Sequence, residues 1–187
     1  MVGGFNEYFV GKHLAFWSDE EDKPTTQELH KVETFYKTAV EYTPNNPGLH
    51  QVGGRLSEWQ AYVAPDESEE QKKYRQESLE RFRRSTQLRP TWPYAWFDLA
   101  KAKIRALEPD EEFQTALHKA ITLGQNEPDI QQGTMQLGLL AWRILNQEIK
   151  ASVLDTIKTL HQQNPKKLYQ GAKDYDRQDL LCSLVDC

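Results

Sequence analysis

The sequence has very little cysteine, and what it has lies at one end. Only two of the 187 residues are cysteines, Cys182 and Cys187, and both fall within the last six positions. A bond closing so short a loop at a chain end would stabilise the protein little. We therefore expect two unpaired thiols, and cysteine usage leaves the compartment open.

Long apolar runs and blocks of basic residues are also missing. No run of 18 apolar residues occurs, so we expect no membrane span in this chain, and no apolar stretch resembles a signal peptide. The net charge is −5, and without a basic block we expect no nucleic-acid partner. The opening Met1-Val2-Gly3-Gly4 fits a native start, and it equally fits a junction left after an upstream anchor or signal was removed.

Motifs for cofactor or metal chemistry are missing as well. The five histidines are scattered, and none has a second histidine or a cysteine at ligand spacing. No glycine-rich phosphate loop or nucleophile elbow occurs. We therefore expect no metal, no cofactor and no enzymatic activity.

One catalytic alternative stays open, because glycan hydrolysis needs two carboxylates. Glu58 beside Trp59 and Asp98 near Trp96 are the candidates for a glycan-processing site. Each could instead form an ion pair three residues along its own helix, with Arg55 and Lys101 respectively. We favour structural pairing over catalysis.

What the sequence does contain is helical periodicity, with no alternating strand pattern anywhere. Apolar residues at three- and four-residue steps predict helices at 5–17, 26–42, 48–63, 69–88, 92–107, 111–123, 128–146 and 149–162, and a short one at 179–185. This predicts an all-α protein of about eight helices in one domain, 1–187. Within it, 1–24 forms an N-terminal helix and acidic loop, 25–165 forms helix hairpins, and 166–187 forms a polar tail with a short capping helix.

The junctions between helices repeat. Leu88-Arg89-Pro90-Thr91-Trp92-Pro93 returns 35 residues later as Leu123-Gly124-Gln125-Asn126-Glu127-Pro128. Proline suits the first turn of a helix, where its missing N–H costs nothing. A repeat of this length built of paired helices is typical of a right-handed tetratricopeptide-like (TPR-like) solenoid of antiparallel hairpins.

The pair Gly53-Gly54 lies inside a predicted helix, where each glycine costs about 1 kcal/mol relative to alanine. Close approach of a neighbouring helix would explain the pair, and we favour that interpretation. A kink or break in the helix is the alternative.

The segment 93–124 resembles one tetratricopeptide unit. Trp96, Leu99 and Ala100 match characteristic positions of that family's first helix, and Leu117 and Ala120 match those of its second. Lys103 departs from the pattern because the family places a tyrosine there.

A second resemblance covers most of the chain. Gly54-Arg55-Leu56-Ser57-Glu58-Trp59, followed by Leu88-Arg89-Pro90-Thr91-Trp92-Pro93-Tyr94-Ala95-Trp96, is similar to tetratricopeptide-like proteins of bacterial exopolysaccharide biosynthesis clusters (VpsP-type). Similar segments occur in tails of some O-antigen ligase-like membrane proteins. The resemblance implies a periplasmic or membrane-anchored domain that holds a protein partner of polysaccharide assembly or export. Without an upstream anchor, a cytoplasmic adaptor would be the alternative.

First helices of hairpins line the concave side of such solenoids, so they supply the candidate partner-binding residues. These are Arg55, Glu58, Trp92, Tyr94, Asp98, Lys101 and Arg105. The basic members could receive acidic groups of a partner, or they could be ordinary surface charges. The tryptophans and Tyr94 could instead stack on sugar rings, which makes a saccharide-binding module the alternative function, or they could pack between helices.

Overall fold

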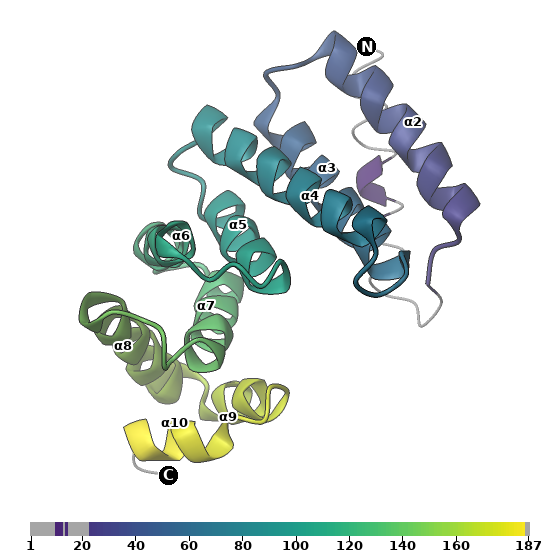
Figure 1. Ribbon diagram of the computed structural model, residues 1–187. Coiled ribbons are helices and arrows are strands. Elements are labelled where there is room, and N and C mark those ends of the chain that lie inside the picture. Colours follow the sequence, from purple (N-terminus) through teal and green to yellow (C-terminus); the bar gives the residue numbers. More distant parts are fainter. Residues whose placement is uncertain (1–9, 13, 15–22, 186–187) are drawn as a thin grey trace. The chain divides into compact units, whose positions relative to one another are not determined.

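The computed structural model describes residues 10–12, 14 and 23–185. The chain divides into two compact units, Met1–Pro90 and Thr91–Cys187, and each is considered by itself. Within the described residues all regular secondary structure is helical, which confirms the all-α prediction (Figure 1). None of the helices in these ranges is long and apolar enough to cross a bilayer.

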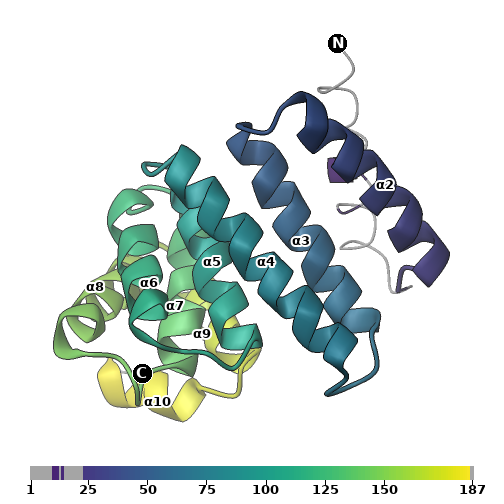
Figure 2. The same cartoon turned by 45° about the horizontal axis from the view of Figure 1, so that its top comes forward.

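The first unit contains α2 (Thr26–Tyr42), α3 (Pro47–Val63) and α4 (Glu69–Leu88). Each helix begins where a polar side chain can accept hydrogen bonds from its free backbone N–H groups. Thr25 forms a reciprocal capping box with Glu28, Asn46 caps α3, and Ser68 caps α4. Helices α3 and α4 form an antiparallel hairpin, and α2 lies along the other side of α3 (Figure 2).

The core of this unit also takes in the N-terminal segment. Val10 and Leu14 are buried in one cluster with residues of α2 and α3, among them Leu29, Val32 and Leu49. Residues 10–12 and 14 are helical, and the other residues of the predicted 5–17 helix lie outside the described ranges.

Close helix packing explains Gly53-Gly54, as the sequence predicted. A Cβ atom on Gly53 would lie 2.3 Å from the Tyr36 ring, and one on Gly54 would lie 2.5 Å from the Phe82 ring. Both aromatic side chains are buried. The two glycines therefore let α2 and α4 approach opposite sides of α3, and α3 continues through them without a break.

A buried polar network joins the three helices of the first unit. Arg81 of α4 donates to Glu33 of α2 at 3.1 Å and to the Gly53 carbonyl of α3 at 3.0 Å. Its guanidinium also lies 4.4 Å from the centroid of the Tyr36 ring. Burial raises the pKa of the Tyr36 hydroxyl, although the Arg81 charge opposes this effect.

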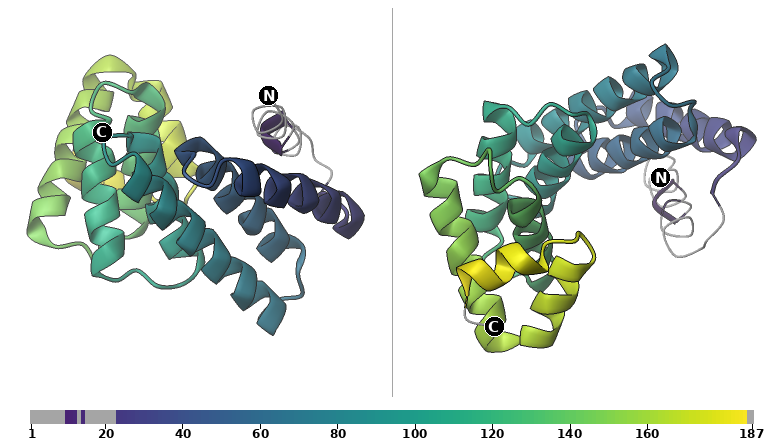
Figure 3. Two further views of the ribbon diagram at one scale, coloured as in Figure 1. Left: turned by 90° about the horizontal axis from the view of Figure 1, so that it is seen from above. Right: turned by 60° about the horizontal axis from the view of Figure 1, so that its bottom comes forward.

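The second unit contains α5 (Pro93–Arg105), α6 (Glu111–Leu123), α7 (Pro128–Leu140), α8 (Gln147–Gln163), α9 (Pro165–Lys173) and α10 (Gln178–Leu184). They form three successive hairpins, and we call α5, α7 and α9 the first helices and α6, α8 and α10 the second helices. Every first helix starts with a proline at its first position. First helices contact first helices (α5 with α7, α7 with α9), and α6 contacts α8 (Figure 3).

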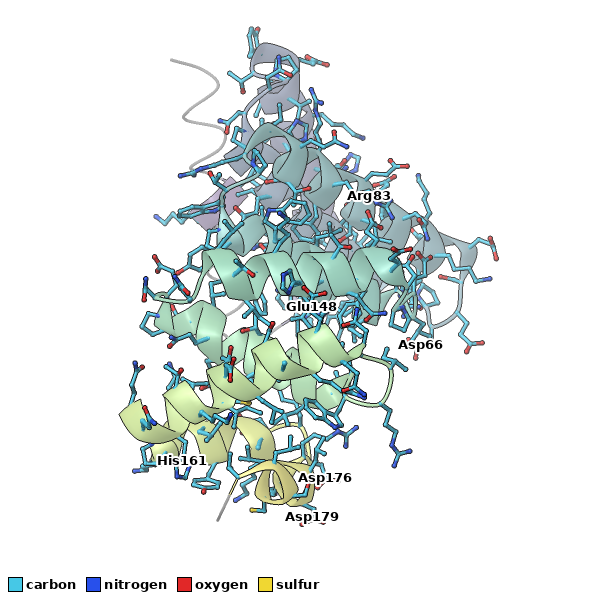
Figure 4. All side chains as sticks on the ribbon, turned by 90° about the vertical axis from the view of Figure 1, so that its left-hand side faces the viewer. Asp66, Arg83, Glu148, His161, Asp176 and Asp179 are labelled. Carbon is cyan, nitrogen blue, oxygen red and sulfur yellow. The ribbon has the colours of Figure 1, made fainter. Side chains whose placement is uncertain are left out.

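Figure 4 shows the second-helix side of this unit, where Glu148 at the start of α8 lies next to α6. The Glu148 carboxylate is 3.9 Å from Nε2 of His118 on α6. The contact is consistent with second helices stacking on one another, which is the arrangement of a helical-repeat array.

Three sequence predictions for this unit were wrong. The seventh helix ends at Leu140 rather than near residue 146, and turns follow it. The tail predicted as polar with one short capping helix contains a further helix, α9, which Pro165 begins. Cys182 is disulfide-bonded rather than free, and Cys187 lies outside the described residues.

Candidate protein-binding surface

Helix α5 holds most of the predicted partner-binding residues. One side of the helix is buried and carries small and aliphatic residues, including Ala95, Leu99 and Ala102. The other side carries Tyr94, Phe97 and Lys101 in half-buried positions, and Arg105 is exposed. Steps of three and four residues along the helix therefore separate a packing face from an accessible face.

Trp92 and Tyr94 lie together at the start of α5. Their ring centroids are 5.1 Å apart with the planes tilted by 36°. The Tyr94 hydroxyl donates to Glu127, the residue before α7, at 3.3 Å. Partial burial and the nearby Glu127 carboxylate both raise the pKa of Tyr94. The aromatic pair thus bridges the starts of two neighbouring first helices, and neither ring is fully exposed.

Asp98 and Lys101 form the ion pair that the sequence predicted. The Lys101 ammonium lies 3.3 Å from an Asp98 carboxylate oxygen. Asp98 is only 1% exposed, while the Lys101 side chain is partly accessible and its ammonium lies 5.7 Å from the Phe97 ring centroid. A buried carboxylate that is bound to a lysine orients that lysine and is poorly placed to contact a substrate.

Arg55 and Glu58 belong to α3 in the first unit. Arg55 is exposed and Glu58 is half-buried. One turn further along α3, Tyr62 is exposed, Trp59 meets it edge-on at 5.6 Å, and the Lys23 ammonium lies 4.4 Å from the Tyr62 centroid. The predicted residues therefore belong to helices of different units, two of them to α3 and the others to α5 and the residue before it.

Sequence reasoning missed the role of Lys103, although it marked the position as unusual. Lys103 is 1% exposed, and its ammonium lies 2.7 Å from Asp110, 3.2 Å from Glu108 and 3.3 Å from Glu112. A lysine at a tyrosine position, followed by four carboxylates within nine residues, was the available signal. The cluster joins the end of α5 to the start of α6, where Asp110 also accepts from the Phe113 backbone N–H.

The protonation states of this cluster follow from two opposing effects. Burial disfavours the charged form of Lys103, but its hydrogen bonds to the three carboxylates outweigh burial and raise its pKa. Burial likewise opposes ionisation of Asp110, but the bonds from Lys103 and the Phe113 N–H outweigh it and lower the Asp110 pKa. Lys103 and Asp110 are therefore both charged at neutral pH.

Charge is unevenly divided between first and second helices of the second unit. The first helices carry six basic residues against two acidic ones, and the second helices carry three basic residues against five acidic ones. The basic residues of the first helices are Lys101, Lys103, Arg105, Lys166, Lys167 and Lys173. Only Lys103 among these is buried. The first helices are therefore the more basic set in a protein whose net charge is negative.

The described residues contain no group of three or more histidine, cysteine or acidic side chains that could hold a metal ion. The two carboxylates considered for glycan hydrolysis, Glu58 and Asp98, lie in different units.

Comparison with known proteins supports the fold. No protein-family model matches the sequence, and no curated protein matches it. The structure is similar to the crystal structure of a thermophilic TPR protein from Thermus thermophilus, with a TM-score of 0.59 and 20% sequence identity over 83% of this chain and 72% of that one.

It is also similar to the human IFIT1 dimer with PPP-AAAA, with a TM-score of 0.54 and 15% identity over 96% of this chain. A second human IFIT1 dimer structure, with m7Gppp-AAAA, gives a TM-score of 0.53 and 14% identity over 95% of this chain. The chain spans only 47% and 46% of these two IFIT1 chains. At these identities the likeness shows the fold alone: the chain is an all-helical protein with a TPR-like helical-repeat architecture.

Proposed function

We propose that this protein is a non-catalytic interaction module that binds a protein partner. The observation that carries the proposal is the accessible face of α5, where Lys101 and Arg105 stand on a helix whose opposite face is packed. Helical-repeat arrays present their neighbouring first helices as an extended binding surface. The excess of basic residues on these helices favours a partner segment rich in aspartate and glutamate.

The partner's setting stays a prediction. The resemblance of 54–59 and 88–96 to proteins of exopolysaccharide clusters supports a partner in an envelope polysaccharide machine. A periplasmic or membrane-anchored location is part of the same proposal.

The proposal is tested with a random peptide display library selected against the full chain. We expect the selected peptides to be enriched in acidic residues and to bind more weakly as salt is raised, because exposed charges are screened. Arg105→Glu should lower the affinity of the protein for a selected peptide about tenfold, which is within the range that a charge reversal in an interface produces.

The matched control is Lys119→Glu, which makes the same charge change at an exposed position on the second helix α6. It should leave the affinity unchanged. Selected peptides without acidic enrichment, or equal weakening by both variants, would refute binding by the first helices.

A further inference from the structure

One acidic residue of α5 is buried next to the accessible face of that helix. Asp98 is 1% exposed, although most other buried positions of α5 carry small or aliphatic residues such as Ala95 and Ala102. Removing a carboxylate from water is costly unless a cation pairs with it. An alanine at this position would avoid that cost. Packing alone therefore does not explain an aspartate at position 98.

A cation that pairs with Asp98 is Lys101, three residues further along α5. Its ammonium donates to an Asp98 carboxylate oxygen at 3.3 Å. The Lys101 side chain is partly accessible, whereas the Asp98 side chain is buried. A lysine side chain has many rotamers in water and loses this freedom when its charge is bound. The buried carboxylate therefore holds a partly accessible ammonium close to the helix.

The ammonium is held beside the contact between two first helices. It lies 5.7 Å from the centroid of the Phe97 ring, within the range of a cation–π contact. The Phe97 ring packs against α7, where a Cβ atom on Gly133 would meet it. Phe97 is therefore enclosed between α5 and α7, and the Lys101 charge lies next to that enclosed ring.

The sign of the Asp98 charge separates two possible effects on an acidic partner. Asp98 is the only acidic residue of α5, and its charge lowers the attraction of this helix for carboxylates. Orientation acts in the opposite direction, because a lysine that is already ordered before binding costs less to immobilise. Removing the Asp98 charge would therefore strengthen binding if charge dominates, and weaken it if orientation dominates.

We propose that Asp98 is a positioning residue, which fixes Lys101 at the contact between α5 and α7 so that its ammonium receives a carboxylate of the partner there. The inference rests on the proposed function and adds which cation determines where the partner's carboxylate binds. An ammonium has three donors, so one that is held by a buried carboxylate can also donate to a partner. Asp98 acts through Lys101 and does not contact the partner itself.

The test measures the affinity of the full chain for an acidic peptide selected from the display library. Asp98→Asn keeps the shape of the side chain and removes its charge. We expect the affinity to fall about three- to tenfold, because Lys101 must then be ordered during binding. The matched control is Asp129→Asn, which removes an exposed carboxylate of α7 that lies 3.9 Å from Lys167. This control should leave the affinity unchanged or raise it slightly, because exposed ion pairs contribute little.

The same change in a Lys101→Met background separates positioning from a structural role. Without the ammonium, Asp98→Asn has nothing to release and removes only a negative charge near the peptide. We therefore expect the affinity in this background to stay unchanged or to rise. A structural role of Asp98 in α5 would instead lower the affinity by the same factor in both backgrounds. The melting temperature of each variant shows that it is folded at the assay temperature.

A measurement on the unaltered protein does not depend on any variant. Nuclear magnetic resonance relaxation of the Lys101 ammonium nitrogen should show restricted motion before the peptide is added. A freely moving ammonium would overturn the proposal. So would Asp98→Asn that binds the peptide as tightly as the wild type or more tightly, and so would equal weakening in both backgrounds.

Failure of this inference and failure of the proposed function give different results. If Arg105→Glu weakens the acidic peptide and Asp98→Asn does not, the positioning role is wrong and the proposed function stands. Selected peptides without acidic enrichment would overturn both.

Discussion

Replacing Gly54 by alanine tests the packing of α3 against α4. In an open helix this change stabilises the protein by about 1 kcal/mol, because glycine has low helix propensity. Here the new Cβ would lie 2.5 Å from a ring carbon of Phe82, whose side chain is fully buried. Ordinary carbon contacts are about 3.5–4.0 Å. The new Cβ and the Phe82 ring must therefore move apart by roughly 1 Å within a tightly packed interface.

Overpacking of this kind costs about 1–3 kcal/mol. With a rigid ring as the obstacle we take the upper half of that range, which leaves a net loss of about 1–2 kcal/mol after the propensity gain. Urea unfolding monitored by circular dichroism measures this loss: the urea concentration at the midpoint should fall, while the slope of the free energy against urea concentration stays unchanged.

The double variant Gly54→Ala, Phe82→Leu supplies the control for this prediction. Leucine lacks the ring atoms that the new Cβ would meet, so the two changes should compensate each other in part. We expect a coupling free energy of about 1–2 kcal/mol in the double-mutant cycle. If Gly54→Ala alone raises the free energy of unfolding by about 1 kcal/mol, the close-packing argument is refuted.

Two further predictions concern Asp110, which contacts the buried Lys103, and the buried Glu33. The pKa of Asp110 is lowered from its ordinary value of 3.8, so ionised Asp110 stabilises the folded state above about pH 3.8, and this contribution is lost as the pH falls through the folded-state pKa. Lys103→Met should therefore reduce the loss of stability at acidic pH. An unchanged dependence of stability on acidic pH would contradict the role of the cluster. Glu33→Gln removes the buried charge that accepts a hydrogen bond from Arg81. Urea unfolding should show a free energy of unfolding lower by about 1–3 kcal/mol. A loss below about 0.5 kcal/mol would show that Arg81 is satisfied without Glu33.

The fold was largely predictable because it depends on periodicity, caps and prolines. Ser68 and Asp110 cap their helices, as serine and aspartate before a helix favour. Pro93 and Pro128 begin first helices, as the repeated junction predicted. The same rule applied to Pro165 would have revealed α9. It was missed because the residues after Pro165 are mostly polar and only Leu168, Gly171 and Ala172 are buried.

The candidate surface was less predictable because exposure depends on packing between helices. The Asp98–Lys101 pair follows from helical spacing. The burial of Lys103 does not, because lysine is rarely buried unless it is paired, and its partners come from the following turn and helix.

Chemical-shift mapping on the isotope-labelled protein tests the central claim most directly. An acidic peptide selected from the display library is titrated into the protein while the backbone amide signals are followed. We expect the largest shifts on the accessible face of α5, at Lys101 and Arg105, and we expect Arg105→Glu to move the midpoint of the titration to an about tenfold higher peptide concentration. Shifts concentrated on the second helices α6 and α8, with α5 unchanged, would contradict the claim.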